Sequence, residues 1–323
     1  MTQVDPRDLR QAARTALIQC MGLRAGESCL VVTDRELFSV GAAFWEEAFQ
    51  AGAEAMLIEM IPRRRNGEEP PQAVAWAMKH ANVVIIPTSK SLSHTAARRE
   101  ACQAGARIAS LPGITEECAV RTLVADYDEI AERSIRLAQI LSEGKVARLT
   151  SARGTRLELS IEGREGYPDT GQYMTPGDFG NLPAGEAYIA PLEGSANGIL
   201  VVDGSMAGAG VVEDPIILHI EDGYAMRVEG GEGARRLEET IAGLGREARN
   251  VAELGIGTNH LAIISGRVLE DEKVMGTVHV ALGDNSGFGG RVRVPSHLDG
   301  VILSPTLEVD GRVIIDNGHV TVW

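Results

Sequence analysis

A histidine and an aspartate stand two positions apart in the segment Ser296-His297-Leu298-Asp299. Alternate residues of a β-strand point to the same side of the sheet, so a strand here would present the imidazole of His297 beside the carboxylate of Asp299. An imidazole and a carboxylate together suit a divalent transition-metal ion. The pair alone is a frequent chance pattern, so a metal-site hypothesis depends on further ligands elsewhere in the chain.

Three carboxylates and a second histidine occupy unusual places upstream of this pair. His279 lies in an apolar run flanked by valines, and Glu253 also lies inside an apolar run. Glu186 opens a strand-like segment, and Glu272 comes just before the strand expected to carry His279. A buried carboxylate without a partner is costly, so these residues predict a shared metal cluster. The alternatives are a core histidine at position 279 and a solvated turn residue at position 272.

Four segments carry these residues. In their order along the chain and in their local sequence, they resemble the motifs of the leucyl aminopeptidase (aminopeptidase T) family of metallo-aminopeptidases. The segments are NLPAGE at 181–186, ELGIGTN at 253–259, DEKVMGTVHVALG at 271–283 and HLD at 297–299. The resemblance implies a site for two divalent metal ions, with Glu253 as the carboxylate that bridges them. The metal ligands that it implies are Glu186, Glu253, Glu272, His279, His297 and Asp299.

Mixed imidazole and carboxylate ligands suit Zn, Mn, Co or Fe, whereas Ca prefers oxygen ligands only. Two ions about 3.5–4 Å apart polarise a carbonyl group and convert a bridging water into hydroxide. A free amine of the substrate can then dock on one ion. The leading expectation is therefore an aminopeptidase-like hydrolase that cleaves an amide next to a free amino end, in a small molecule or short peptide.

One position departs from the peptidases of that family. They carry a tyrosine, thought to steady the oxyanion, seven positions after the histidine of the third motif, where this chain has Ser286. Peptide hydrolysis here requires another donor, for which Tyr188, Lys273 and His94 are the candidates. His94 follows a predicted strand at an edge where α/β sheets often place their sites. Its alternative interpretation is a neighbour of a helix cap at Ser93.

The same resemblance extends to ring-cleaving enzymes similar to 2,5-dihydroxypyridine dioxygenase. These use one Fe(II), held by two histidines and one carboxylate, and have a histidine where this chain has Glu253. A metal-dependent aminohydrolase and a metal-stabilised structural or binding domain are further alternatives. Hydrolysis is favoured because Glu253 suits a bridging role, and because Glu186 and Glu272 would be redundant around a single iron.

Short apolar strands alternate with helices over residues 1–145, which predicts an α/β domain with a mainly parallel sheet. Strands are expected at 29–33, 55–60, 82–87 and 106–110, and helices at 40–51, 73–80, 95–104 and 126–141. Residues 146–323 alternate apolar and polar positions, which predicts a strand-rich α+β domain that binds the metal and is catalytic. Its expected elements are strands at 146–150, 156–161, 200–203, 215–221 and 224–228 and a helix at 233–243.

Composition argues against several classes of function. The 323 residues carry a net charge of −14, which disfavours nucleic-acid binding. No apolar run reaches the ~18 residues of a membrane helix, and the N-terminus has no apolar signal core. The four cysteines show no CxxC spacing, and no glycine-rich nucleotide motif is present. We expect a cytoplasmic protein with neither nucleic-acid nor membrane partners and, from the family resemblance, a homodimer.

Overall fold

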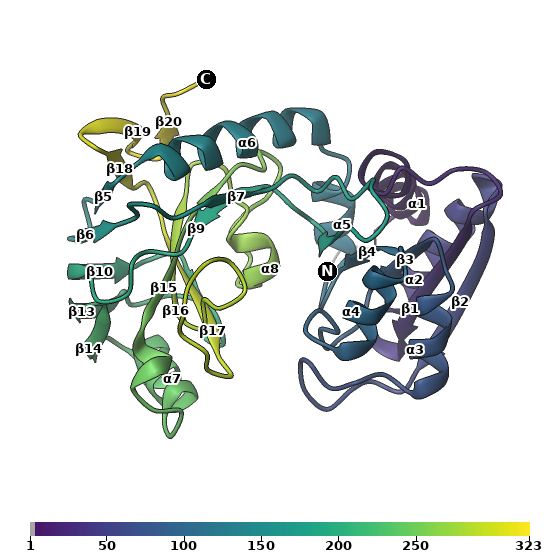
Figure 1. Ribbon diagram of the computed structural model, residues 1–323, viewed down its shortest axis with the longest axis horizontal. Helices are drawn as coiled ribbons and strands as arrows, with labels where there is room; N and C mark the ends of the chain where they lie inside the picture. The colour runs from purple at the N-terminus through teal and green to yellow at the C-terminus, as the bar shows by residue number, and fades with distance from the viewer. Residues whose placement is uncertain (1–3) are drawn as a thin grey trace. The chain divides into compact units, whose positions relative to one another are not determined.

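The computed structural model describes residues 4–323, and the chain forms two compact units. The first unit comprises Met1–Asp128 and Gly171–Ala184, and the second comprises Glu129–Thr170 and Gly185–Trp323 (Figure 1). The polypeptide therefore passes from the first unit to the second, returns once, and ends in the second. None of the described helices is long and apolar enough to cross a membrane.

The first unit is built on a five-stranded parallel sheet with the strand order β2-β1-β3-β4-β8. Its strands are β1 (Ser28–Asp34), β2 (Glu54–Met60), β3 (Val83–Ile86), β4 (Arg107–Ser110) and β8 (Phe179–Asn181). Its helices are α1 (Pro6–Thr15), continued by a π turn (Ala16–Cys20), α2 (Phe38–Gln50), α3 (Gln72–Lys79), α4 (Ala96–Gln103) and α5 (Glu116–Thr122), with a short 3-10 turn at Arg35–Leu37.

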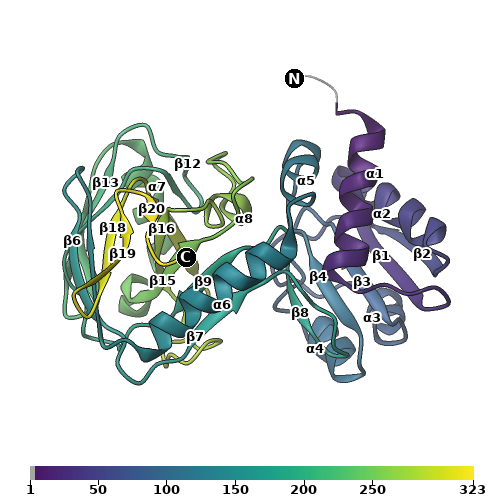
Figure 2. The same ribbon diagram turned by 90° about the horizontal axis from the view of Figure 1, so that it is seen from above.

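Helices cover both faces of this parallel sheet, α1 and α2 on one side and α3 and α4 on the other (Figure 2). Leu30 and Val32 of β1 pack with Val74 and Met78 of α3 in one apolar cluster. The alternate β1 residues are buried as well. Strands covered on both faces need apolar residues at every position, which explains why these strands read as continuous apolar runs.

The second unit holds two antiparallel sheets. The eight-stranded sheet contains β5 (Val146–Thr150), β6 (Arg156–Ser160), β10 (Asn197–Val202), β13 (Ile216–Glu221), β14 (Tyr224–Glu229), β18 (Thr306–Val309), β19 (Arg312–Asp316) and β20 (His319–Val320). The seven-stranded sheet contains β7 (Gly166–Asp169), β9 (Glu186–Ile189), β11 (Ser205–Met206), β12 (Gly210–Val211), β15 (Val251–Gly257), β16 (Val278–Gly283) and β17 (His297–Ile302). The helical elements are α6 (Tyr127–Glu143), α7 (Glu232–Ile241), a 3-10 turn (Arg246–Arg249) and α8 (Val268–Asp271).

One apolar core joins the two antiparallel sheets. Leu157 and Leu200 of the eight-stranded sheet belong to the same cluster of buried residues as Leu254, Val280 and Ile302 of the seven-stranded sheet. Because side chains alternate along a strand, the residues between these core positions point to the opposite face of the seven-stranded sheet. That opposite face carries the polar residues singled out in the sequence.

The expected parallel sheet and the expected antiparallel strands are both confirmed, and most predicted elements match to within a few residues. The expected domain boundary at residue 145 differs in two ways from the division of the chain into its two units. Nearly all of α6 groups with the second unit, and residues 171–184 return to the first. This return occurs because β8 extends the parallel sheet by pairing with β4 (Figure 2). The Phe179-Gly180-Asn181 sequence of β8 shows no apolar strand pattern that would predict it.

Candidate metal centre

Five adjacent strands of the seven-stranded sheet bring the predicted residues to one face. The register places Tyr167 of β7 opposite Tyr188 of β9, Tyr188 opposite Gly255 of β15, and Gly255 opposite His279 of β16. Residues two positions away along each strand share the same face. The face therefore also carries Glu186 of β9, Glu253 of β15, and the pair His297 and Asp299 of β17.

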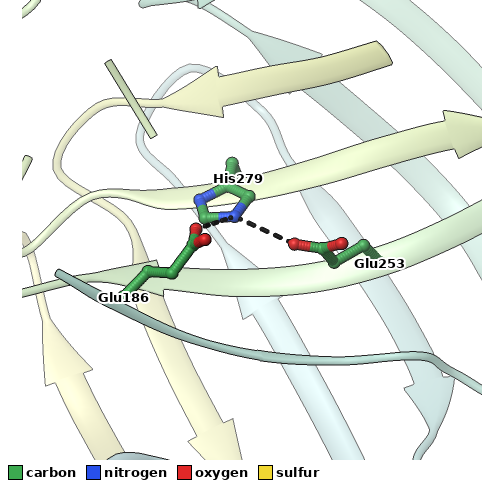
Figure 3. Close-up of side chains that lie close together, drawn as sticks. All are labelled: Glu186, Glu253 and His279. Carbon is green, nitrogen blue, oxygen red and sulfur yellow. Dashed lines mark hydrogen bonds and ion pairs between the residues drawn. The ribbon is translucent and has the colours of Figure 1, made fainter. Parts of the chain in front are cut away.

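The first group of ligand-type side chains is Glu186, Glu253 and His279 (Figure 3). The Nε2 atom of His279 lies 3.1 Å from Oε2 of Glu186 and 3.3 Å from Oε1 of Glu253. All three side chains are buried. One imidazole between two carboxylates from neighbouring strands is a donor set that a divalent cation can use.

The second group is Glu253, His297 and Asp299. The Nε2 atom of His297 lies 3.3 Å from Oε2 of Glu253 and 3.3 Å from Oδ1 of Asp299. Glu253 thus offers one oxygen to each group. The predicted proximity of His279 and His297 is confirmed, since each imidazole lies 3.3 Å from the same carboxylate.

Gly255 makes room for the imidazole of His279, a role that the sequence reasoning did not assign. A Cβ atom at position 255 would lie 1.9 Å from Nε2 of His279. Only glycine leaves space for a ring over the neighbouring strand at that distance. The signal was present in the sequence as the glycine two positions after Glu253 in the ELGIGTN segment.

Lys273 is almost fully buried and forms ion pairs with three carboxylates. Its Nζ atom lies 2.6 Å from Oε1 of Glu186, 2.7 Å from Oε1 of Glu272 and 3.6 Å from Oδ2 of Asp169. Glu272 therefore lies beside Lys273 and joins neither ligand group, which differs from the ligand role expected for it. The sequence reasoning missed Asp169, because β7 has a Gly-Tyr-Pro-Asp sequence without an apolar strand pattern.

The charged side chains on this face of the sheet shift one another's pKa values. Burial opposes a charge on His279, but the hydrogen bonds and charges of Glu186 and Glu253 outweigh burial and raise its pKa to about 10. Burial is likewise outweighed at Asp299, where the charge of His297 lowers the pKa of the carboxyl. Lys273 and His279 together lower the pKa of Glu186 against its burial. Because a metal needs neutral imidazoles, binding here must release protons.

Aromatic rings border the second group. The Tyr188 ring stacks on Tyr167 with centroids 5.8 Å apart and meets Phe288 edge-on at 5.4 Å. Phe288 meets the His297 ring edge-on at 5.9 Å. Ser286, at the position of the family tyrosine, donates its hydroxyl to Asp284 at 3.1 Å. The loop that carries Ser286 thus contributes an aromatic neighbour to the site through Phe288.

His94 belongs to the first unit and is exposed. The alternative interpretation of His94 placed a helix cap at Ser93; the cap of α4 is instead Thr95, whose Oγ1 atom accepts from the backbone N–H of Arg98 at 3.2 Å. Ser93 instead donates its hydroxyl to Ser110 at 3.2 Å. A catalytic role for His94 stays a prediction.

Comparisons with known proteins extend over nearly the whole chain. The chain is 22% identical over 261 residues to the 2,5-dihydroxypyridine 5,6-dioxygenase of Pseudomonas putida, covering 77% of this chain and 73% of that protein. The structure of 2,5-dihydroxypyridine dioxygenase from Pseudomonas putida KT2440 superposes with a TM-score of 0.83 at 19% identity, covering 99% of both chains. Wild-type AmpT from Thermus thermophilus has a TM-score of 0.73 at 18% identity, covering 98% of this chain and 99% of that one. Both structures share the fold.

The family comparison favours the dioxygenase branch over the peptidase branch expected first. The family model described as NicX, 2,5-dihydroxypyridine 5,6-dioxygenase, matches residues 8–322. This match includes every residue of the two ligand groups. The chain therefore belongs to the NicX family.

Proposed function

We propose that this protein is a metal-dependent dioxygenase that opens the ring of a hydroxylated pyridine, with one Fe(II) held by Glu253, His297 and Asp299. The observation that carries the proposal is this group, whose ligand atoms all lie within 4.8 Å of one another. Membership of the NicX family supports the reaction class. The His297 side chain is 32% exposed, so this group is more accessible than the one around His279.

The donor set fits a ferrous ion with one difference from the usual arrangement. Non-haem Fe(II) oxygenases use two histidines and one carboxylate, and here Glu253 replaces one histidine. Nitrogen and carboxylate oxygen remain the donor types. The Nδ1 atom of His297 lies 2.8 Å from the carbonyl oxygen of Asp284, which favours the tautomer whose Nε2 faces Glu253 and Asp299.

Bound ferrous iron would supply a centre at which dioxygen and the aromatic substrate are activated together. The chain's own residues hold and orient this centre. Glu186 Oε2, which lies 3.1 Å from His279 Nε2, can accept the proton of a ring hydroxyl. Lys273 holds the other oxygen of Glu186 at 2.6 Å, so that carboxylate keeps its orientation.

Oxygen consumption tests the proposal. The purified protein, loaded anaerobically with Fe(II), is offered 2,5-dihydroxypyridine in an oxygen electrode, with Zn- and Mn-loaded samples beside it. We expect oxygen uptake that matches loss of the pyridine, with Fe(II) only. His297→Ala and Asp299→Asn should abolish it, whereas His319→Ala, at an exposed position on β20, should not. No uptake by the Fe(II)-loaded wild type would reject the dioxygenase.

A two-metal hydrolase is the second candidate, and one observation favours it. The two oxygens of Glu253 face different histidines, Oε1 towards His279 and Oε2 towards His297, each at 3.3 Å. A carboxylate shared in this way is suited to bridge two cations, which is the arrangement used to generate hydroxide for hydrolysis. The ligand set as a whole thus suits the aminopeptidase-like reaction anticipated from the motifs.

Metal stoichiometry and an amide substrate separate the two candidates. Elemental analysis of protein saturated with Fe(II), Zn, Mn or Co gives the number of ions per chain. Leucyl-amide cleavage is measured with each metal. One ion per chain and no amide cleavage support the dioxygenase. Two ions per chain together with cleavage would assign the hydrolase, and Glu253→Gln should then reduce the stoichiometry.

A further inference from the structure

Tyr188 lies opposite Gly255, the residue over which the imidazole of His279 packs. The two residues are cross-strand neighbours, and Gly255 is in turn the neighbour of His279. Because Gly255 has no side chain, the imidazole of His279 lies over it, and Tyr188 is the neighbour of Gly255 on the other side. Glu186 stands two residues before Tyr188 on the same face. The tyrosine is therefore built into the face that carries both ligand groups.

Two other aromatic rings fix the orientation of the Tyr188 ring. Tyr167 stacks on it with an interplanar angle of 28°, and Phe288 meets it at 80°. Phe288 also meets the ring of His297, a member of the second ligand group. Such aromatic contacts restrict the ring beyond simple area burial. The Tyr188 hydroxyl is consequently held in one place on the site face.

The Tyr188 hydroxyl has no hydrogen-bond partner within residues 4–323, and its ring is half-buried. The hydroxyls of two other tyrosines are engaged: Tyr167 donates to Glu165 at 3.1 Å, and Tyr173 donates to the carbonyl oxygen of Asn181 at 2.7 Å. Tyrosine hydroxyls at buried positions usually have such partners. The hydroxyl of Tyr188 is therefore available to a bound molecule.

The other two donors near the centre are already engaged. The Ser286 hydroxyl donates to Asp284, and the ammonium group of Lys273 is enclosed by three carboxylates. Oxygen atoms that gain negative charge during a reaction are stabilised by fixed donors. Both candidate reactions involve such an oxygen, on a hydroxylated ring in one case and on an amide carbonyl in the other.

We propose that the Tyr188 hydroxyl donates a hydrogen bond to an oxygen atom of the substrate at the Glu253–His297–Asp299 group. The inference rests on the metal centre of the proposed function, and it holds for either of the two candidate reactions. It makes Tyr188 a catalytic residue, because its hydroxyl touches the substrate. Phe288 and Tyr167 are positioning residues that act through the orientation of the Tyr188 ring.

The substitution Tyr188→Phe tests this role, because it keeps the ring contacts and removes only the hydroxyl. With whichever substrate the wild type turns over, we expect kcat to fall about 100-fold, the scale of losing one fixed donor. Metal content and Tm should match the wild type. Tyr224→Phe is the matched control: it removes the hydroxyl of a tyrosine on β14 of the eight-stranded sheet, away from the ligand groups, and should leave kcat unchanged.

Binding gives a readout separate from turnover. Anaerobic calorimetric titration with 2,5-dihydroxypyridine, or with leucyl-amide if that is the substrate, should show about tenfold weaker binding to Tyr188→Phe. If wild type is active and Tyr188→Phe equals it in kcat and affinity, the inference alone is wrong. Loss of metal or of Tm in Tyr188→Phe would also reject it, in favour of a structural role. A wild type that neither binds nor turns over either probe would reject the proposed function and the inference together.

Discussion

At the scale of single residues, the geometry of the ligand groups depends on glycines that stand beside the ligand-type side chains. Along β15, Glu253 supplies a carboxylate, and Gly255 and Gly257 supply space on the same face. The neighbouring strand β16 contributes the imidazole of His279 into the space over Gly255, and Tyr188 of β9 lies opposite Gly255 on the other side. The imidazole of His279 on β16 can thus take its position because Gly255 on the next strand, β15, has no side chain.

Gly255→Ala should therefore weaken metal binding. Its Cβ atom would lie 1.9 Å from Nε2 of His279, so the imidazole must move away from Glu186 and Glu253. We expect metal affinity to fall about 10- to 100-fold, as for other changes that misalign ligands. Competition with a chromophoric chelator measures the affinity. Gly287→Ala is the control, because a Cβ there meets nothing within 4 Å. Unchanged affinity in Gly255→Ala would contradict the spacing argument.

At the scale of secondary-structure elements, protonated histidines join the strands when no metal is bound. His279 of β16 lies between Glu186 of β9 and Glu253 of β15. His297 of β17 pairs with Glu253 across the sheet and with Asp299 on its own strand. These ion pairs neutralise carboxylates that would otherwise repel one another. A bound cation would replace the protons in this role.

This arrangement predicts how the stability of the metal-free protein depends on pH. The pKa of His279 rises from 6.5 to about 10 on folding, so its contribution is complete below pH 6.5 and is lost as the pH rises towards 10. The lowered pKa of Asp299 adds stability that is present above 3.8 and is lost at lower pH. Tm should therefore be highest between about pH 5 and 6.5 and should decline above that range.

Differential scanning calorimetry of the metal-free protein from pH 4 to 9 checks this dependence. His279→Gln is the informative variant, since it keeps a side chain of similar length and cannot gain the charge. Its Tm should be lower than that of the wild type at pH 6, and the decline from pH 6.5 to 9 should be shallower. A wild-type Tm that rises over pH 6.5 to 9 would contradict the assignment of charge to His279.

Some residues of this site could be predicted from the sequence and others could not, and the difference has a physical reason. The two-residue spacing of His297 and Asp299 made their same-face placement on β17 predictable. Glu253 and His279 lie in uniformly buried strands, and their place beside that pair was expected from the family resemblance. The ion pair of Lys273 with Asp169 was not predictable, because it depends on how β7 pairs with β9. Short strands without an apolar pattern leave no local signal, and pairing between distant segments then decides the structure.

At the scale of the whole molecule, the candidate ligands are confined to one unit. Glu186, Glu253, His279, His297 and Asp299 all lie in the second unit, on the sheet face opposite its apolar core. The first unit contributes none of the residues in the two ligand groups. A metal ion would therefore link strands within one unit, and its effect on stability should be concentrated there.

Metal removal should accordingly destabilise the second unit selectively. An ion that binds only the folded state, present at 100 times its Kd, stabilises by about 2.7 kcal/mol. This corresponds to a fall in Tm of about 5–10 °C on chelation. Hydrogen–deuterium exchange followed by mass spectrometry should show lost protection in β9, β15, β16 and β17 and little change in β1 to β4. Asp299→Asn, which weakens one ligand, should show a smaller difference between loaded and chelated samples. Equal Tm and equal exchange with and without metal would show that the carboxylates and histidines of this face are held by their mutual ion pairs alone.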